Sequence, residues 1–421
     1  QVATTPLFGT STRRHEHDRV TVSNPWTATV TLASNYLTQF TAQPLMGLAA
    51  GTPKNNGVPI PGITDGYSGA NPDMGAVIAG RSAVTYGSQS TVTPTWLASL
   101  PLLTWTELPN TSMTQVGSGL GITAYSGACL KTSGSQLLVF GGGHGDYDGN
   151  EVNSVILSAN SPVSVQLRGQ SANRPPNVSH YPDGRPSSRH SFGSLQFSAV
   201  NNRMISLDCL FPNNGALPTT WFNTIDGFSL DTNDWVTAGT YANGPTAFNS
   251  ANSSCQDALG NIFFWSEQGS VLWRIPNGAT SGANTGVAIG SGNNFDMKYD
   301  SVRNRIVVFG PNPSFIDATT LARTTFSFTG NTGVGTGSTY WSYCADRDSF
   351  LGMRYLTGSS AVFECNASTF NITSLSVAGT APFAPNDGHS SYFGRFGYAP
   401  ELKGFYFLPQ GDRNISFFRT G

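Results

Sequence analysis

Short apolar runs separated by turn-forming residues recur along most of the chain. Segments such as QLLVF (136–140), RIVVF (305–309) and GFYF (404–407) are bounded by glycine, proline, asparagine or aspartate. Runs of this length between turn signals are typical of buried β-strands. Long runs with helical spacing of apolar residues are not found in the sequence. The pattern therefore predicts an all-β protein.

A unit of four strands recurs from about residue 103 onward. Each unit has a short first strand, a strongly apolar second strand, a third strand and a more exposed fourth strand. The first unit comprises GACLKT, QLLVFGG, VNSVILS and VSVQLRG, within residues 127–169. The later units begin with HSFGSLQFSA (190–199), SSCQDA (253–258), FDMKYD (295–300), YWSYCAD (340–346) and GRFGYAP (394–400).

The sixth unit ends without a fourth strand, whereas an unused strand, LTWTELPN (103–110), precedes the first unit. A ring explains both facts, because the N-terminal strand would complete the last sheet. A β-propeller buries its sheet faces between neighbouring blades and leaves only short edges. The sequence thus predicts a six-bladed β-propeller over residues 101–421. A seventh, degenerate blade between residues 161 and 188 is the alternative.

Residues 1–100 do not follow the repeat and predict an N-terminal β extension or a wrap around the propeller rim. A charged arm with alternating strands (12–40) precedes a loop region rich in Gly, Pro and Asn (53–75). His15 and His17 share one face of an extended strand, but two histidines without a third ligand hold metal weakly. We expect no metal or other cofactor, and an arm suited to self-assembly or attachment to a particle.

Charge, hydropathy and cysteine content narrow the classes of partner, the location and the redox state that we expect for the chain. The formal net charge is −2 and charged residues make up 11% of the chain, so a nucleic-acid partner is not expected. No apolar run approaches the ~20 residues of a membrane span. The chain begins at Gln1 without a signal segment, so we expect a removed leader or export by another route. The five cysteines favour buried thiols, with a Cys344–Cys365 bridge as the alternative.

Ring geometry predicts which loops share a face. Loops that enter a first strand, and loops that join a second to a third strand, open on the same side, here called the top face. Three such loops belong to neighbouring blades one, two and six, so their polar residues should converge on one sector. This sector and other top loops supply the candidate glycan-binding residues: His144, Asp146, Tyr147, Arg189, His190, Trp221, Tyr340, Trp341, His389, Tyr392 and Arg395.

Three motifs resemble a group of uncharacterised kelch-like propellers from bacteria and their phages: GGGHGDYDGNEV (141–152), GRPSSRHSF (184–192) and YFGRFGYAPELKGFYFLP (392–409). The Trp that begins the fourth strand of the second unit, Trp235, is also kelch-like. The resemblance covers most of residues 103–421 and implies a kelch-like propeller. An extracellular or particle-borne protein of this type would recognise glycan on a cell surface, which is the function we expect.

The combination of His, Tyr and Arg is also similar to the propeller-fold ulvan lyases. In such chemistry a Tyr or His removes the C5 proton of a uronic acid, and an Arg neutralises the carboxylate. That resemblance implies His144, Tyr147, Arg189 and His190 as catalytic residues. A polysaccharide lyase acting on an anionic, uronate-containing polymer is therefore the first alternative.

A structural coat component of a virion or filament is the second alternative, since few charges and an N-terminal arm suit assembly. Other enzyme classes fit less well. Copper oxidases on kelch propellers need a Tyr–Cys crosslink, and no cysteine lies in the expected top loops. A metal hydrolase would place more carboxylates near the histidines. A serine hydrolase would need a G-x-S-x-G elbow between a strand and a helix.

Overall fold

The computed structural model describes residues 93–117, 126–142, 147–207, 224–242, 244, 253–266, 270–290, 296–335, 339–356, 359–382 and 394–421, without the side chains of 355–360. Contacts group Val92–Gly421 into one compact unit. Apart from its last residues, the predicted N-terminal extension lies outside the described residues. Of the described helices, none is both long and apolar enough to span a membrane.

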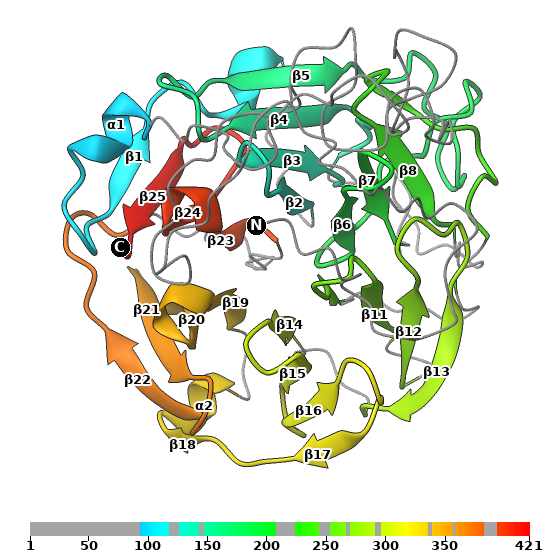
Figure 1. Cartoon of the computed structure of the whole chain (residues 1–421). Helices are drawn as coiled ribbons and strands as arrows, with labels where there is room; N and C mark the ends of the chain where they lie inside the picture. Colours follow the sequence, from blue (N-terminus) through cyan, green and yellow to red (C-terminus); the bar gives the residue numbers. More distant parts are fainter. Residues whose placement is uncertain are drawn as a thin grey trace, which may run out of the picture. The chain divides into compact units, whose positions relative to one another are not determined.

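Six small sheets stand in a ring, and each is one blade (Figure 1). Neighbouring strands within a blade are antiparallel, except for the parallel pair of β18 (Thr329–Gly330) and β22 (Asn371–Leu375), and are mostly consecutive in the chain. Blade one contains β2 (Gly127–Lys131), β3 (Gln136–Phe140), β4 (Val152–Ile156) and β5 (Ser164–Arg168). Blade two contains β6 (Leu195–Ser198), β7 (Arg203–Ser206), β8 (Asp226–Ser229) and β9 (Asp234–Trp235). Blade three contains β10 (Ser254–Gln256), β11 (Ile262–Ser266), β12 (Val271–Ile275) and β13 (Ala283–Ala288).

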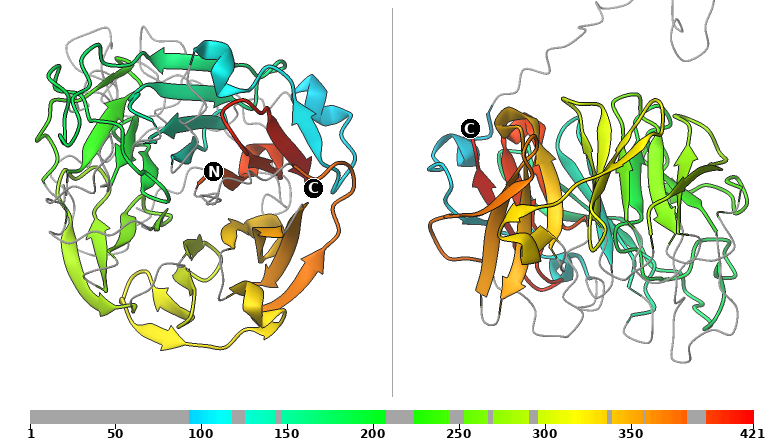
Figure 2. Two further views of the ribbon diagram at one scale, coloured as in Figure 1. Left: turned by 180° about the vertical axis from the view of Figure 1, so that it is seen from behind. Right: turned by 90° about the horizontal axis from the view of Figure 1, so that it is seen from below.

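The remaining blades follow the same order around the ring, and Figure 2 shows their strands running between the two faces. Blade four contains β14 (Asp296–Asp300), β15 (Arg305–Phe309), β16 (Ser314–Asp317) and β17 (Arg323–Thr325). Blade five contains β19 (Tyr340–Cys344), β20 (Ser349–Leu356), β21 (Ser359–Asn366), β22 (Asn371–Leu375) and the short β18 (Thr329–Gly330). Blade six contains β23 (Phe396–Ala399), β24 (Gly404–Phe407), β25 (Ile415–Arg419) and β1 (Thr106–Leu108). The short helices are α1 (Thr95–Ala98), α2 (Thr332–Gly335), η1 (Met113–Val116), η3 (Ala345–Arg347) and η4 (Pro400–Leu402).

Strand β1 closes the ring, as the sequence predicts. It pairs antiparallel with β25, and Thr106 lies opposite Phe417. The side chain of Asn414 ties the two strands together, donating to Glu107 at 2.6 Å and accepting from the backbone N–H of Thr111 at 3.0 Å. Without β1, strand β25 would expose a free edge, which is prone to pairing with other chains. The six-bladed propeller is therefore confirmed.

The repeat predicts one outer strand, TTFSFTG (324–330), at the end of blade four, but the structure divides this segment between two blades. Strand β17 ends at Thr325, and β18 instead pairs in parallel with β22 of blade five. Two aromatic contacts accompany this change: Phe326 stacks on Phe370 at 3.6 Å, and Phe328 stacks on Phe309 at 5.7 Å. Half-buried Phe326 still stacks on Phe315 of β16 at 6.4 Å, whereas Phe328 is buried against Phe309, so the chain leaves β16 after Phe326.

The apolar core lies between adjacent blades. Between blades four and five, Trp341 stacks on Phe309 with ring centroids 4.7 Å apart, and Phe350 meets the same ring edge-on. Between blades one and two, Trp235 packs edge-on against Phe140 at 4.7 Å. Fully buried aromatic rings contribute about 1.5–3 kcal/mol each through burial. The four described cysteines, Cys129, Cys255, Cys344 and Cys365, are buried free thiols, so the alternative bridge is not formed.

Candidate functional site

The loop after β3 in blade one packs against the segment that precedes β6 in blade two. The backbone N–H of Gly142 donates to the carbonyl of Arg189 at 2.9 Å. The Asn150 amide donates to the carbonyl of Pro186 at 2.8 Å, and the Tyr181 hydroxyl donates to the carbonyl of Asp148 at 2.7 Å. Two of the three top loops that the sequence predicts as neighbours are thus in direct contact.

The glycines of the first loop allow this close contact. Gly142 has a φ of +135°, which favours glycine over other residues. A Cβ at Gly142 would lie 3.0 Å from the Tyr147 side chain and 3.1 Å from the Ser188 hydroxyl. The absent side chain therefore leaves room for Tyr147 beside the segment of blade two.

Tyr147, Glu151 and Gln170 form a hydrogen-bonded group that we call the Tyr147 cluster. Tyr147 is half-buried, and its hydroxyl donates to one oxygen of the Glu151 carboxylate. The Gln170 amide donates to the Tyr147 hydroxyl at 2.8 Å. Glu151 is completely buried, and among the described residues its second oxygen, Oε2, has no hydrogen-bond donor. The carboxylate thus fixes the orientation of a tyrosine that is itself partly accessible.

Arg189 lies in a buried ion network at the start of blade two. The Arg189 guanidinium donates to the Asp226 carboxylate at 3.1 Å and to the Thr224 hydroxyl at 2.9 Å. His180 Nε2 lies 2.9 Å from the other Asp226 oxygen. Burial alone would raise the pKa of Asp226, but the hydrogen bond from His180 and the charge of Arg189 outweigh it and lower the pKa. The network joins the segment before β6 to the start of β8.

The other described residues of the predicted site are largely buried. His190 is 2% exposed, with its ring edge-on to Phe192. Arg395 is also buried and donates to the carbonyl of Pro409 at 3.1 Å. Tyr340 and Trp341 are buried between blades. Five predicted residues lie outside the described residues: His144, Asp146, Trp221, His389 and Tyr392.

Sequence reasoning missed four side chains of these two networks: Glu151, Gln170, His180 and Asp226. Two of them share a position, since Glu151 directly precedes the third strand of blade one and Asp226 begins the third strand of blade two. Asp226 is the one charged residue in an otherwise uncharged segment (222–230), whereas Glu151 follows the polar run DYDGN (146–150). A charged residue directly before or at the start of a third strand is the sequence feature that could have identified Glu151 and Asp226. Gln170 and His180 lie in the long connection between the blades, where the sequence has no repeat to guide the choice.

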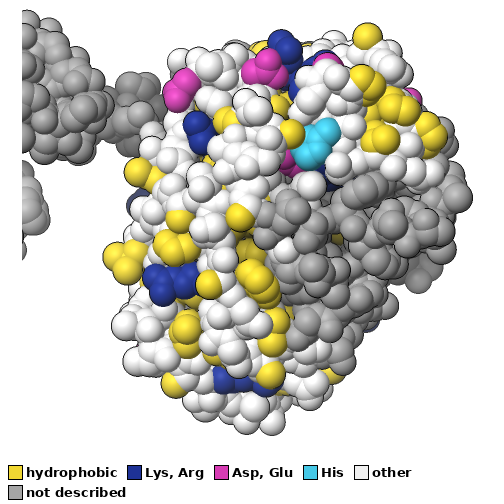
Figure 3. Space-filling view, turned by 90° about the vertical axis from the view of Figure 1, so that its right-hand side faces the viewer, with side chains coloured by type: hydrophobic (Ala, Val, Ile, Leu, Met, Phe, Trp, Pro, Cys, Tyr) yellow, Lys and Arg dark blue, Asp and Glu magenta, His cyan; other side chains and the backbone are white. Residues whose placement is uncertain are grey.

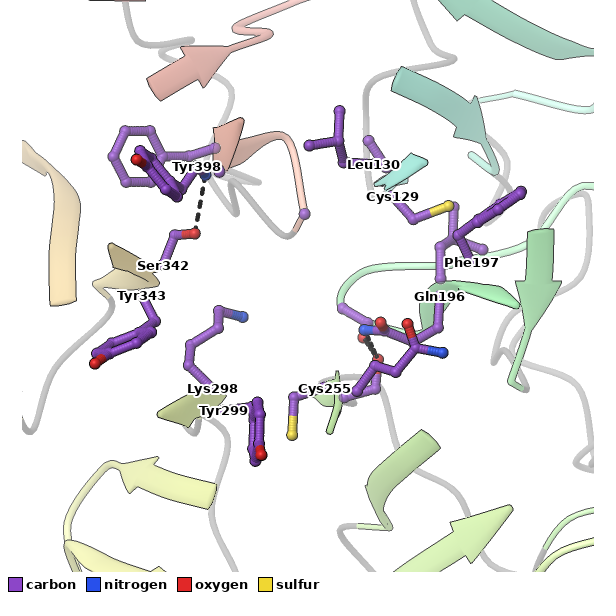
Figure 4. Close-up of a pocket in the computed structure, with 18 of the residues that line it drawn as sticks. Cys129, Leu130, Gln196, Phe197, Cys255, Lys298, Tyr299, Ser342, Tyr343 and Tyr398 are labelled. Atoms are coloured by element: carbon purple, nitrogen blue, oxygen red, sulfur yellow. Dashed lines mark hydrogen bonds between the residues drawn. The ribbon is translucent and has the colours of Figure 1, made fainter. Parts of the chain in front are cut away.

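A separate cavity of about 300 Å³ lies on the axis of the ring (Figure 4). The first strands of all six blades contribute to its wall. No motif or repeat in the sequence predicts this cavity. The hydrophobic pattern locates the inner strands but not which of their side chains face the axis.

No family model matches the chain, and no curated protein sequence matches it. Three solved structures are similar in arrangement. A nidogen/laminin complex is 13% identical, with 65% of this chain and 85% of that chain covered and a TM-score of 0.37. A structural genomics protein of unknown function from Bacteroides thetaiotaomicron is 10% identical, with 75% of each chain covered and a TM-score of 0.44. TolB from Acinetobacter baumannii is 10% identical, with 60% of this chain and 55% of that chain covered and a TM-score of 0.38.

Proposed function

We propose that this propeller is a kelch-like glycan-recognition protein that acts outside the cell or on a phage particle. The observation that carries the proposal is the Tyr147 cluster. A partly accessible tyrosine ring can stack on a sugar ring, and the Gln170 amide beside it can hydrogen-bond sugar hydroxyls. Glu151 would act as a positioning residue, because it holds the Tyr147 hydroxyl from beneath.

The described surface is compatible with an uncharged, hydroxyl-rich partner. Figure 3 views the molecule from the side of blades two and three, and charged side chains there are sparse and separated. Among the described residues on that face, most of the surface is backbone and side chains that are neither charged nor hydrophobic, with small apolar patches between them. Such a surface favours hydrogen bonding and ring stacking over long-range electrostatic attraction. Binding would therefore depend weakly on salt concentration.

Binding of immobilised polysaccharides by the purified full chain tests the proposal. Tyr147→Ala should weaken binding to a recognised polymer roughly tenfold, because aromatic contacts are frequent hot spots. Gln170→Ala should weaken it roughly three- to tenfold, the effect of one hydrogen bond. Gln166→Ala is the matched control, since Gln166 is also half-buried in the same blade but lies outside the cluster. The proposal fails if the folded protein binds no polymer in a broad panel, or if Tyr147→Ala binds as tightly as the native chain.

The hydrogen bond from Tyr147 to Glu151 also favours a second candidate, a polysaccharide lyase. The Tyr147 oxygen would take the C5 proton of a uronate while its own proton passes to Glu151. Electrons of the broken C–H bond would form the C4–C5 double bond as the C4–O bond breaks, and the departing oxygen would keep that bonding pair and take a proton from solvent. Both arginines are paired with an aspartate, but the Arg189 side chain is 2% exposed and that of Arg174, which pairs with Asp148 at 3.1 Å, is 27% exposed. Arg174 is therefore the better candidate to face the substrate carboxylate.

Ultraviolet absorbance of the unsaturated product distinguishes the two candidates. A lyase should produce an absorbance rise on at least one polyuronate, and Tyr147→Phe should abolish that rise while leaving the fold intact. Binding without any absorbance rise would leave the recognition function alone. A persistent rise in Tyr147→Phe would exclude Tyr147 as the base.

A further inference from the structure

The axial cavity has the size and lining of a small-molecule site. Its volume of about 300 Å³ lies at the lower end of the range for ligand pockets, ~300–1,000 Å³. The labelled side chains in Figure 4 come from the first strands of different blades and surround an open centre. Described polar and aromatic lining residues include Gln196, Gln256, Lys298, Tyr299, Ser342 and Tyr398.

Lys298 is the one charged side chain among the described residues that line the cavity. Its ammonium group donates to the Asp296 carboxylate at 2.6 Å. The Asp296 carboxylate is buried outside the cavity lining, where it also accepts hydrogen bonds from the Ser253 hydroxyl at 2.9 Å and from the backbone N–H of Trp341 at 2.7 Å. In Figure 4 the nitrogen of Lys298 points toward the open centre. Because an ammonium group has three donors, it can bind a ligand while keeping Asp296.

The rest of the wall offers neutral contacts and no competing anion. The Tyr398 hydroxyl donates to Asp346 at 2.7 Å and the Tyr299 hydroxyl donates to Asn304 at 2.8 Å, so their rings are the surfaces left for a ligand. The Gln196 amide donates to Ser254 at 2.9 Å, which leaves its carbonyl oxygen as an acceptor. Burial raises the pKa of the Cys255 thiol to about 12, so this lining group stays neutral near pH 7.

We propose that the axial cavity binds a small polyhydroxylated carboxylate, the size of one sugar-acid ring. The carboxylate pairs with the Lys298 ammonium, and the hydroxyls bond the side chains of Gln196 and Gln256. The tyrosine rings supply apolar contact for the face of the ligand. Lys298 keeps its bond to Asp296, and a remaining N–H donor gives the ligand carboxylate a charge-assisted hydrogen bond, which is about twice as strong as a neutral one. This site is separate from the Tyr147 cluster and does not depend on it.

Calorimetric titration of the full chain with D-glucuronate, D-glucose and inorganic phosphate tests this site. Glucuronate should bind roughly tenfold or more tightly than glucose, because glucose lacks the group that pairs with Lys298. Lys298→Gln should lose roughly tenfold or more in glucuronate affinity, whereas Lys298→Arg should keep most of it. Lys403→Gln makes the same charge change at an exposed residue outside the cavity and should leave binding unchanged. Thermal unfolding of each variant verifies the fold.

Three results would overturn the inference. The first is no heat of binding for glucuronate with the folded native chain. The second is equal affinity in Lys298→Gln and the native chain. The third is that phosphate binds as tightly as glucuronate, which would show that the site binds anions in general and does not select sugar acids. Loss of polymer binding in the Tyr147 variants with unchanged glucuronate binding separates this site from the proposed recognition function.

Discussion

Replacing Asp226 with asparagine should destabilise blade two strongly. Asp226 and Arg189 have side chains only 5% and 2% exposed, so water cannot replace the lost carboxylate. The substitution weakens two hydrogen bonds to a charged carboxylate, each about 1.5–3 kcal/mol, and leaves the Arg189 guanidinium buried without a countercharge. Removing one partner of a buried ion pair costs about 3–5 kcal/mol. Arg189 keeps its bond to Thr224, so we expect the lower end of that range, about 3 kcal/mol.

Urea unfolding at fixed m value measures this loss as a shift of the midpoint. The double variant Arg189→Met/Asp226→Asn removes both charges. It should be more stable than the sum of the single effects predicts, by about 2 kcal/mol, because no uncompensated charge remains. If Asp226→Asn stays within about 1 kcal/mol of the native chain, or if the two effects simply add, the buried pair does not have the role described.

The same pair predicts a pH dependence with a definite sign. The pKa of Asp226 is lower in the folded protein than its ordinary value. The folded state therefore gains stability at pH values above the unfolded pKa of about 3.9, and loses it as the pH falls through the lower folded value. The stability difference between the native chain and Asp226→Asn should be full at neutral pH and shrink below about pH 4.

Three further predictions concern the stability of the propeller and the reactivity of its buried thiols. Gly184→Ala should lower the free energy of unfolding by about 1 kcal/mol, because Gly184 has a positive φ. Gly394→Ala should lower it by at least about 2 kcal/mol more, because the added Cβ would also lie 1.9 Å from a carbonyl oxygen of β2. Urea unfolding measures both changes. Asn414→Ala should cost about 1 kcal/mol and speed hydrogen exchange in β1, because the side chain links β1 to the C-terminal end of the chain. Burial raises the pKa of Cys255 and Cys365 to about 12, so peptide mapping after native alkylation should find both unmodified.

The strands, their grouping and the closure of the ring could be predicted from the sequence. Each blade needs an apolar second strand buried on both faces, and that requirement leaves continuous runs such as 136–140 and 305–309. Closure followed from a strand without a partner at 103–110 and a last sheet that lacked one. The first signal is local, because the spacing of apolar residues along a segment indicates how a strand is buried. The second comes from comparing the two ends of the repeat, each of which is incomplete alone.

Only the tertiary structure decided which polar residues are buried in networks and which remain accessible. The sequence places Arg189 and Tyr147 in neighbouring loops, but burial of the first depends on Asp226, a residue 37 positions away. Division of the outer strand after Thr325 likewise depends on Phe370, which lies in the next blade. Lys298 lines a cavity whose wall comes from the first strands of all six blades. These outcomes arise from contacts between distant segments, and a one-dimensional pattern does not encode which partner fills each space.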